Sequence, residues 1–170
     1  MFPSNGVVTH WRHLSSYSRP FKAIVFRETE RHLTFEIVGM NDVPGGTPNH
    51  QNEYEVPIEN RIKVKEGDYM GWAYAGGGAF WSGDTEDLED IVRYSNAFPI
   101  ADLRKGQAVY TGQYIRRRYS VQGVLNSSKC VFDMGVNPGG HRDTSPYISR
   151  GGGTQNQRSS LLIGPKNWSN

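Results

Sequence analysis

The chain has 170 residues, of which 12% are aromatic, with 20 glycines, 9 prolines and a formal net charge of +2. So small a charge gives no bulk electrostatic reason to expect binding to nucleic acid or to a membrane surface. The single cysteine, Cys130, excludes an internal disulfide and a cysteine-rich zinc site.

No stretch approaches the ~18 apolar residues that a membrane-spanning helix needs, so membrane insertion is not expected. The opening residues, MFPSNGVVTH, lack the basic and apolar regions of a signal peptide. Two states of Cys130 stay open: a buried thiol, or a thiol paired outside this chain.

The sequence predicts three strands before residue 40, over 7–14, 21–27 and 33–39. The second carries apolar side chains on both faces, which is typical of a central strand covered on both sides. The third alternates regularly, which predicts one buried and one solvated face.

The next stretch, residues 56–74, has the clearest pattern. Ile62 and Val64 alternate with lysines, Gly67 suits a tight turn, and residues 68–74 alternate again with the large side chains on one face. We therefore predict a strand, a three-residue turn and a second strand that together form a hairpin.

Two segments are loops by composition: residues 41–52, with two prolines and two glycines, and residues 75–84, with three consecutive glycines. A short helix over 84–94 is the one helical alternative in the chain. Residues 109–125 predict two more strands, with Gly112 as a break or bulge.

Together these elements predict an all-β protein, an antiparallel β-sandwich of jelly-roll-like form. The sandwich is expected over residues 1–128. Residues 129–170 are rich in Gly, Ser and Asn and are expected to be a tail or linker with little regular structure.

Part of this pattern resembles a known domain. The matching segments are Trp11, Val25-Phe26-Arg27, Phe35-Glu36-Ile37-Val38-Gly39, Arg61-Ile62-Lys63-Val64-Lys65, Gly67-Asp68, Gly71-Trp72 and Arg118-Tyr119-Ser120-Val121. Over residues 5–125 this is similar to a domain of secreted multidomain proteins of marine invertebrates, although Glu28 stands where that pattern often has proline. The resemblance implies a jelly-roll-like extracellular sandwich with adhesive or recognition roles, and no catalytic signature.

Aromatic residues are dense around the glycine-rich loop, and an exposed indole or phenol face can stack on the apolar face of a sugar. The candidate ligand-binding residues are Trp81, Phe80 and Tyr74, with Asn49 in the other loop. The alternative is core packing, which we expect for Trp72 and leave open for Trp81.

Charged runs give further candidates. Asp84 and Asp87 belong to an acidic run that could supply oxygen ligands to calcium, although a solvated charge run is the ordinary interpretation. Arg116, in a run of three arginines, is a candidate for an anionic ligand. Strand alternation splits those arginines between two faces, so at least one is expected to pair with the acidic loop instead.

The sequence has no nucleophile-elbow, zinc-protease, phosphate-loop or dinucleotide-binding motif in the required context, so we do not expect an enzyme. No cofactor is expected beyond the calcium alternative. The leading hypothesis is a secreted recognition module that binds a glycan through loops at one end of the sandwich. The alternative is a structural or adhesive module that binds another extracellular protein.

Overall fold

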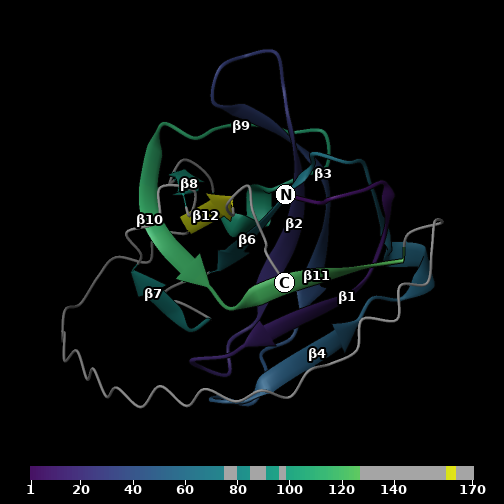
Figure 1. Ribbon diagram of the computed structural model, residues 1–170, viewed down its shortest axis with the longest axis vertical. Coiled ribbons are helices and arrows are strands. Elements are labelled where there is room, and N and C mark those ends of the chain that lie inside the picture. The colour runs from purple at the N-terminus through teal and green to yellow at the C-terminus, as the bar shows by residue number, and fades with distance from the viewer. Residues whose placement is uncertain (75–79, 85–90, 96–98, 127–159, 164–170) are drawn as a thin grey trace.

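A computed structural model describes residues 1–74, 80–84, 91–95, 99–126 and 160–163. These residues form two antiparallel sheets that pack face to face around a common core (Figure 1). The strands are β1 (Gly6–Leu14), β2 (Phe21–Glu28), β3 (Thr34–Val43), β4 (Gln51–Glu55), β5 (Ile62–Val64), β6 (Tyr69–Tyr74), β7 (Ser82–Asp84), β8 (Ile91–Ser95), β9 (Ala108–Tyr110), β10 (Gln113–Tyr119), β11 (Val121–Asn126) and β12 (Ser160–Ile163).

The smaller sheet has the order β11-β1-β4, and β5 also pairs with β1. The larger sheet has the order β7-β10-β8-β12-β6-β2-β3-β9. Every strand pairing in the described residues is antiparallel. The prediction of an all-β, antiparallel sandwich is therefore confirmed.

Helical structure in the described residues is limited to two single 3-10 turns, η1 (Ile58–Asn60) and η2 (Ile100–Asp102). The short helix considered over 84–94 is wrong at both ends, because β7 closes with Asp84 and β8 begins at Ile91. Residues 85–90 lie outside the described part. No described helix has the length and apolar character needed to cross a bilayer.

Strand β2 is buried on both faces, as its sequence predicts. Phe21, Ala23 and Val25 face the small sheet in the main core, while Ile24 and Phe26 face a second cluster on the opposite side of the large sheet. That second cluster is closed by the segment that contains η2, through Ile100 and Leu103, together with Val109 of β9. The large sheet is thus covered on both sides where β2 crosses it.

The predicted hairpin over 56–74 is wrong in its pairing, although both strands and the turn exist. Gly67 has the expected positive φ of 88°, but β5 pairs with β1 and β6 pairs with β2 and β12, so the turn crosses from one sheet to the other. The burial patterns explain this. β5 alternates between buried and exposed, whereas β6 is buried at every residue from Tyr69 to Ala73 and requires a central position in the large sheet.

Strand β12 comes from the region expected to have little regular structure. It lies between β6 and β8, with Leu162 opposite Trp72 on one side and opposite Tyr94 on the other. The rest of residues 127–170, including Cys130, lies outside the described part. The division at residue 128 stays a prediction, but the large sheet includes a strand from beyond it.

A polar link crosses the core between the sheets. The indole Nε1 of Trp11 in β1 donates a hydrogen bond to Oδ1 of Asn41 in β3 at 2.9 Å, and Nδ2 of Asn41 donates to the carbonyl of Asn60 at 2.8 Å. Because Trp11 and Asn41 are both buried, these bonds satisfy polar groups that would otherwise be costly inside the core.

Candidate functional site

Backbone hydrogen bonds gather four segments at the end of the sandwich where β1 terminates. The amide of Trp81 donates to the carbonyl of Leu14 at 3.1 Å, and the amide of Ser120 donates to the carbonyl of Trp81 at 3.0 Å. The amide of Leu14 donates to Ser120 at 2.9 Å, and that of Asn49 donates to Ser15 at 2.9 Å. The loops over 41–52 and 75–84, both predicted as contact loops, therefore meet here in their described parts.

Trp81 is held in an exposed position. Its side chain is 49% exposed, and its indole Nε1 donates a hydrogen bond to Oδ1 of Asn49 at 3.2 Å. Asn49 has a φ of 62°, in the left-handed region that asparagine tolerates better than most residues. Two predicted site residues that are far apart in sequence are thus in direct contact.

Asn52 orders the loop that carries Asn49. Its Oδ1 accepts a hydrogen bond from the amide of Thr47 at 2.8 Å, and its Nδ2 donates to the carbonyl of His50 at 2.7 Å. A Cβ added to Gly46 would lie 2.2 Å from the Asn52 side chain, so only glycine fits there. The loop is therefore built around the half-buried side-chain amide of Asn52 rather than around apolar packing.

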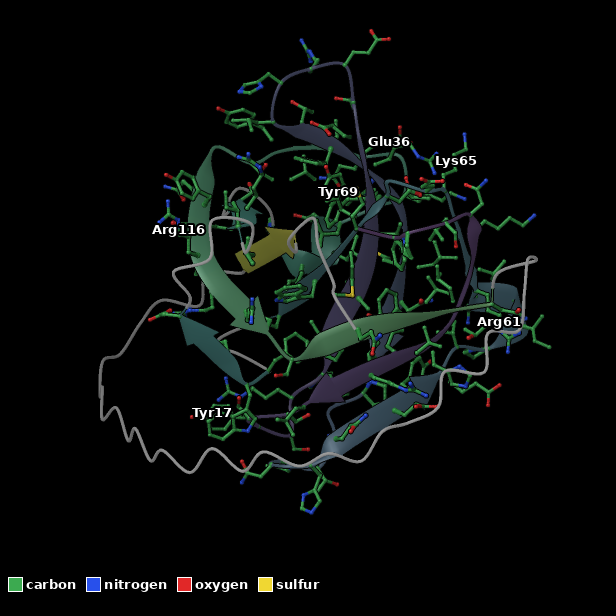
Figure 2. The ribbon with its side chains drawn as sticks, in the orientation of Figure 1. Tyr17, Glu36, Arg61, Lys65, Tyr69 and Arg116 are labelled. Atoms are coloured by element: carbon green, nitrogen blue, oxygen red, sulfur yellow. The ribbon has the colours of Figure 1, made fainter. Side chains whose placement is uncertain are left out.

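A second aromatic ring belongs to the same end. Tyr17, in the turn after β1, is 58% exposed, and the guanidinium of Arg19 lies 5.4 Å from the centre of its ring (Figure 2). A Cβ added to Gly45 would lie 2.6 Å from the amide nitrogen of Arg19, so this turn packs directly on the Asn49 loop. We call Tyr17, Asn49 and Trp81 the end platform.

Phe80 supports this platform from below. It is 4% exposed, and its ring packs against Phe21 at 4.5 Å, His13 at 5.7 Å and Trp72 at 5.8 Å. A ligand-contact role for Phe80 does not fit this burial. Its neighbour in sequence is the exposed Trp81, so alternation along an extended segment places one ring in the core and the next at the surface.

Tyr74 is partly buried at the edge of the same cluster, with its ring 6.4 Å from that of Phe80. Burial raises the pKa of its hydroxyl to about 12. Trp72 is fully buried, as expected for a core residue. Tyr74 therefore lines the aromatic core beneath the end platform rather than its exposed surface.

His13 and Trp72 carry buried nitrogen atoms with no hydrogen-bond partner among the described residues: both ring nitrogens of His13 and Nε1 of Trp72. His13 is 4% exposed and lies edge-on to Phe21 and Phe80. Burial lowers the pKa of this imidazole, because the charged form is poorly solvated there. The neutral form is therefore favoured directly beneath the end platform.

The charged candidates lie on the neighbouring strands β7 and β10. Asp84 is exposed and accepts a hydrogen bond from Nε of Arg117 at 2.7 Å, which raises the pKa of that arginine. The predicted pairing of one arginine of the run with the acidic loop is thus confirmed. Arg116 is exposed on the other face of β10 (Figure 2), so the structure does not bring it together with Asp84.

Asp87, the second predicted calcium ligand, lies outside the described residues. In the part of the chain that the structure describes, no three His, Cys, Asp or Glu side chains cluster closely enough to hold a metal ion. The calcium site stays a prediction.

Sequence reasoning did not single out Tyr17. Its segment, SSYSRP, has the composition of a polar turn, and only the fold shows that this turn lies against the loop of Asn49.

No protein-family model, curated protein or solved structure matches this chain.

Proposed function

We propose that this chain is an extracellular recognition module that binds carbohydrate at the end platform. The observation that carries the proposal is Trp81: a half-exposed indole whose backbone is hydrogen-bonded on both sides and whose Nε1 is held by Asn49. The described residues also expose the rings of Tyr17, Tyr110 and Tyr114, and the indole of Trp81 differs from these in being held by a side-chain hydrogen bond to a neighbouring loop.

The chemistry of such a ring suits a sugar. One face of a pyranose ring presents C–H groups, which bury against an aromatic face, while its hydroxyls need hydrogen-bonding groups nearby. Asn49 and Arg19 supply amide and guanidinium groups beside the two rings. Because Trp81 is already ordered, less side-chain entropy is lost on binding.

The extracellular location is part of the proposal and is supported by the resemblance to domains of secreted proteins. The chain carries no known catalytic motif, which favours recognition over catalysis. The calcium alternative at Asp84 and Asp87 is retained as a condition to be varied in the experiment.

A glycan array tests the proposal, with immobilised neutral and acidic oligosaccharides probed in calcium and again in a chelator. We expect binding that Trp81→Ala weakens at least about tenfold, as truncation of a central aromatic contact does. Tyr114→Ala is the matched control, because Tyr114 is 60% exposed on β10 and lies outside the platform. Absence of binding, or equal binding by Trp81→Ala, would contradict the proposal.

The array also separates the alternatives. Binding that disappears in the chelator would bring the calcium site into the mechanism. A wild-type chain that binds no glycan but self-associates, unaffected by free sugars, would favour the adhesive module instead.

A further inference from the structure

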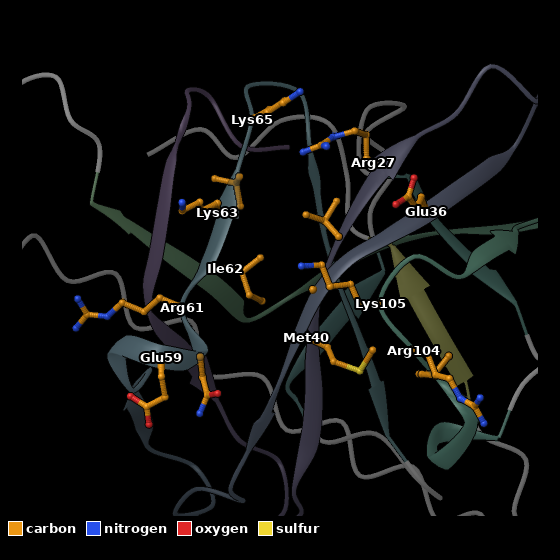
Figure 3. Close-up of a pocket in the computed structure, with 15 residues that line it drawn as sticks. Arg27, Glu36, Met40, Glu59, Arg61, Ile62, Lys63, Lys65, Arg104 and Lys105 are labelled. Atoms are coloured by element: carbon orange, nitrogen blue, oxygen red, sulfur yellow. The ribbon is translucent and has the colours of Figure 1, made fainter.

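A groove of about 900 Å³ opens at the other end of the sandwich from the end platform (Figure 3). It runs between β5 of the small sheet and β3 of the large sheet, and the segment that follows η2 forms its third side. Its volume falls in the range of small-molecule pockets, about 300–1,000 Å³. The groove includes none of the residues of the end platform.

The two sites are far apart along β1. Gly6 and Val8, at the start of this nine-residue strand, pair with β5 beside the groove, whereas Leu14, at its end, contacts the platform segments. A strand of this length spans roughly 25–30 Å. Figure 2 accordingly shows Lys65 and Glu36 on the opposite side of the molecule from Tyr17.

The charge of the groove is unbalanced. Six of its fifteen lining residues are basic and two are acidic, although the chain as a whole has a net charge of only +2. The basic residues are Arg27, Arg61, Lys63, Lys65, Arg104 and Lys105. Arg61 forms an ion pair with Glu55, and Figure 3 shows Arg61, Lys63 and Arg104 directed away from the groove.

Three cations remain at the groove itself. In Figure 3, Arg27 and Lys65 point toward one another across its upper part, and Lys105 extends into it toward Ile62. Within the described part of the chain, neither lysine forms an ion pair with a carboxylate. Arg27 is paired with Asp68 and lies near Glu36, whereas the charges of Lys65 and Lys105 are offset by solvent and salt, or by an anionic ligand.

Arg27 is a fixed donor at this site. Its Nε and Nη2 donate to the two carboxylate oxygens of Asp68, each at 2.8 Å, and Asp68 is 2% exposed. The same carboxylate accepts a hydrogen bond from the amide of Lys65 at 2.8 Å. A single buried carboxylate thus positions the Arg27 side chain and the Lys65 backbone, and it leaves Nη1 of Arg27 for another acceptor.

The floor of the groove argues against a peptide that inserts as an extra strand. Cα atoms of β3 and β5 approach within 8 Å, and a Cβ added to Gly39 would lie 2.9 Å from Cγ2 of Ile62. A strand inserted between two others needs roughly 9–10 Å between the flanking strands. A ligand must therefore lie over Ile62 and interact with side chains at the mouth.

We propose that this groove binds a polyanionic sugar chain, with sulfate groups held by Arg27, Lys65 and Lys105. The cations lie on separate walls of an open groove instead of converging on one point. This arrangement suits several anionic groups spaced along a chain better than a single small anion. The proposal is independent of the end platform, so failure of either leaves the other standing.

The experiment uses the full chain and short dextran sulfate chains, with neutral dextran of the same length, polyglutamate and inorganic sulfate as comparison probes. We expect dextran sulfate to bind most tightly and the affinity to fall as salt is raised. Lys65→Gln combined with Lys105→Gln should weaken binding at least tenfold. The control combines Arg12→Gln on β1 with Lys22→Gln on β2, which removes the same charge outside the groove. It should change the affinity for dextran sulfate little.

Lysine acetylation followed by mass spectrometry adds a second measurement, the protection of individual lysines, which a general effect of net charge would not produce. Bound dextran sulfate should protect Lys65 and Lys105 but not Lys22. The proposal would be overturned if neutral dextran bound as tightly as dextran sulfate or if polyglutamate bound more tightly. It would also be overturned if inorganic sulfate alone saturated the groove, or if both double variants lost the same affinity. Protection spread evenly over all lysines would overturn it as well.

Discussion

Nε1 of Trp81 donates a hydrogen bond to Oδ1 of Asn49, and this one contact joins two loops whose residues are 32 positions apart in sequence. It matters because it fixes the orientation of an exposed indole that would otherwise rotate. Asn49 can make the contact because its backbone adopts a left-handed conformation and its backbone amide donates a hydrogen bond to the carbonyl of Ser15.

Asn49→Gly removes the acceptor but keeps the backbone conformation, because glycine tolerates a positive φ. We expect sugar affinity to fall roughly fivefold, as loss of about 1 kcal/mol predicts, with little change in the unfolding midpoint. Asn49→Ala should lose the same affinity and also about 1 kcal/mol of stability through backbone strain. Thermal melts and titrations of both variants check this, and equal stability of the two would contradict the strain argument.

His13 makes the aromatic cluster beneath the platform sensitive to acid. Its folded-state pKa is lowered from 6.5 by burial, so the unfolded chain takes up a proton first as pH falls. The contribution of His13 to stability is complete above about pH 6.5 and is progressively lost below it, until the lower folded-state pKa is reached.

His13→Leu should therefore flatten the decline in stability between pH 6.5 and pH 5, when urea midpoints of both proteins are compared across that range. The variant retains every other titrating group, so the difference between the two curves isolates the imidazole. Parallel curves for the wild type and the variant would show that His13 does not carry this dependence.

The ion pair of Arg27 with Asp68 supports the turn that crosses between the sheets. Arg27→Met should cost about 2–4 kcal/mol of unfolding free energy, because it leaves a carboxylate that is 2% exposed with the backbone amide of Lys65 as its remaining partner among the described residues. Lys63→Met, also beside the groove but on the exposed face of β5, is the control and should change stability by less than about 0.5 kcal/mol. A small effect for Arg27→Met in chemical denaturation would mean that solvent reaches Asp68.

Strand β12 predicts that the sandwich extends beyond residue 128. A chain ending at residue 128 would leave the facing edges of β6 and β8 without their shared partner. We expect this shortened chain to unfold at lower urea concentration and to aggregate more readily than the full chain. An unchanged unfolding midpoint would instead support the original division into a sandwich and a tail.

Much of the fold follows from local pattern. Alternation predicted β1, β3 and β6, and the continuous apolar run of β2 predicted its burial on both faces. Pairing was harder to predict, because a turn such as that at Gly67 is compatible with a hairpin or with a crossing between sheets. The choice depends on burial of β6 by strands far away in sequence, one of which is β12.

The candidate site was also predictable from local sequence only in part. Composition predicted the two loops but left open whether Trp81 lies in the core or at the surface. Local sequence does not decide which of two adjacent aromatic rings points inward. The fold decides it, since Ser15 bridges to Phe80 and directs that ring into the core. The basic groove was not predicted, because its cations come from β2, β5 and the segment after η2, which meet only in three dimensions.

The most direct test of carbohydrate binding at the platform is a titration followed by the indole N–H signals in a nitrogen–proton NMR spectrum. The chain has four tryptophans, and loss of one signal in Trp81→Phe assigns the relevant resonance. With a soluble form of the oligosaccharide best bound on the array, the Trp81 signal should shift saturably while those of buried Trp11 and Trp72 stay in place. Saturable binding that leaves the Trp81 signal unmoved would contradict the account.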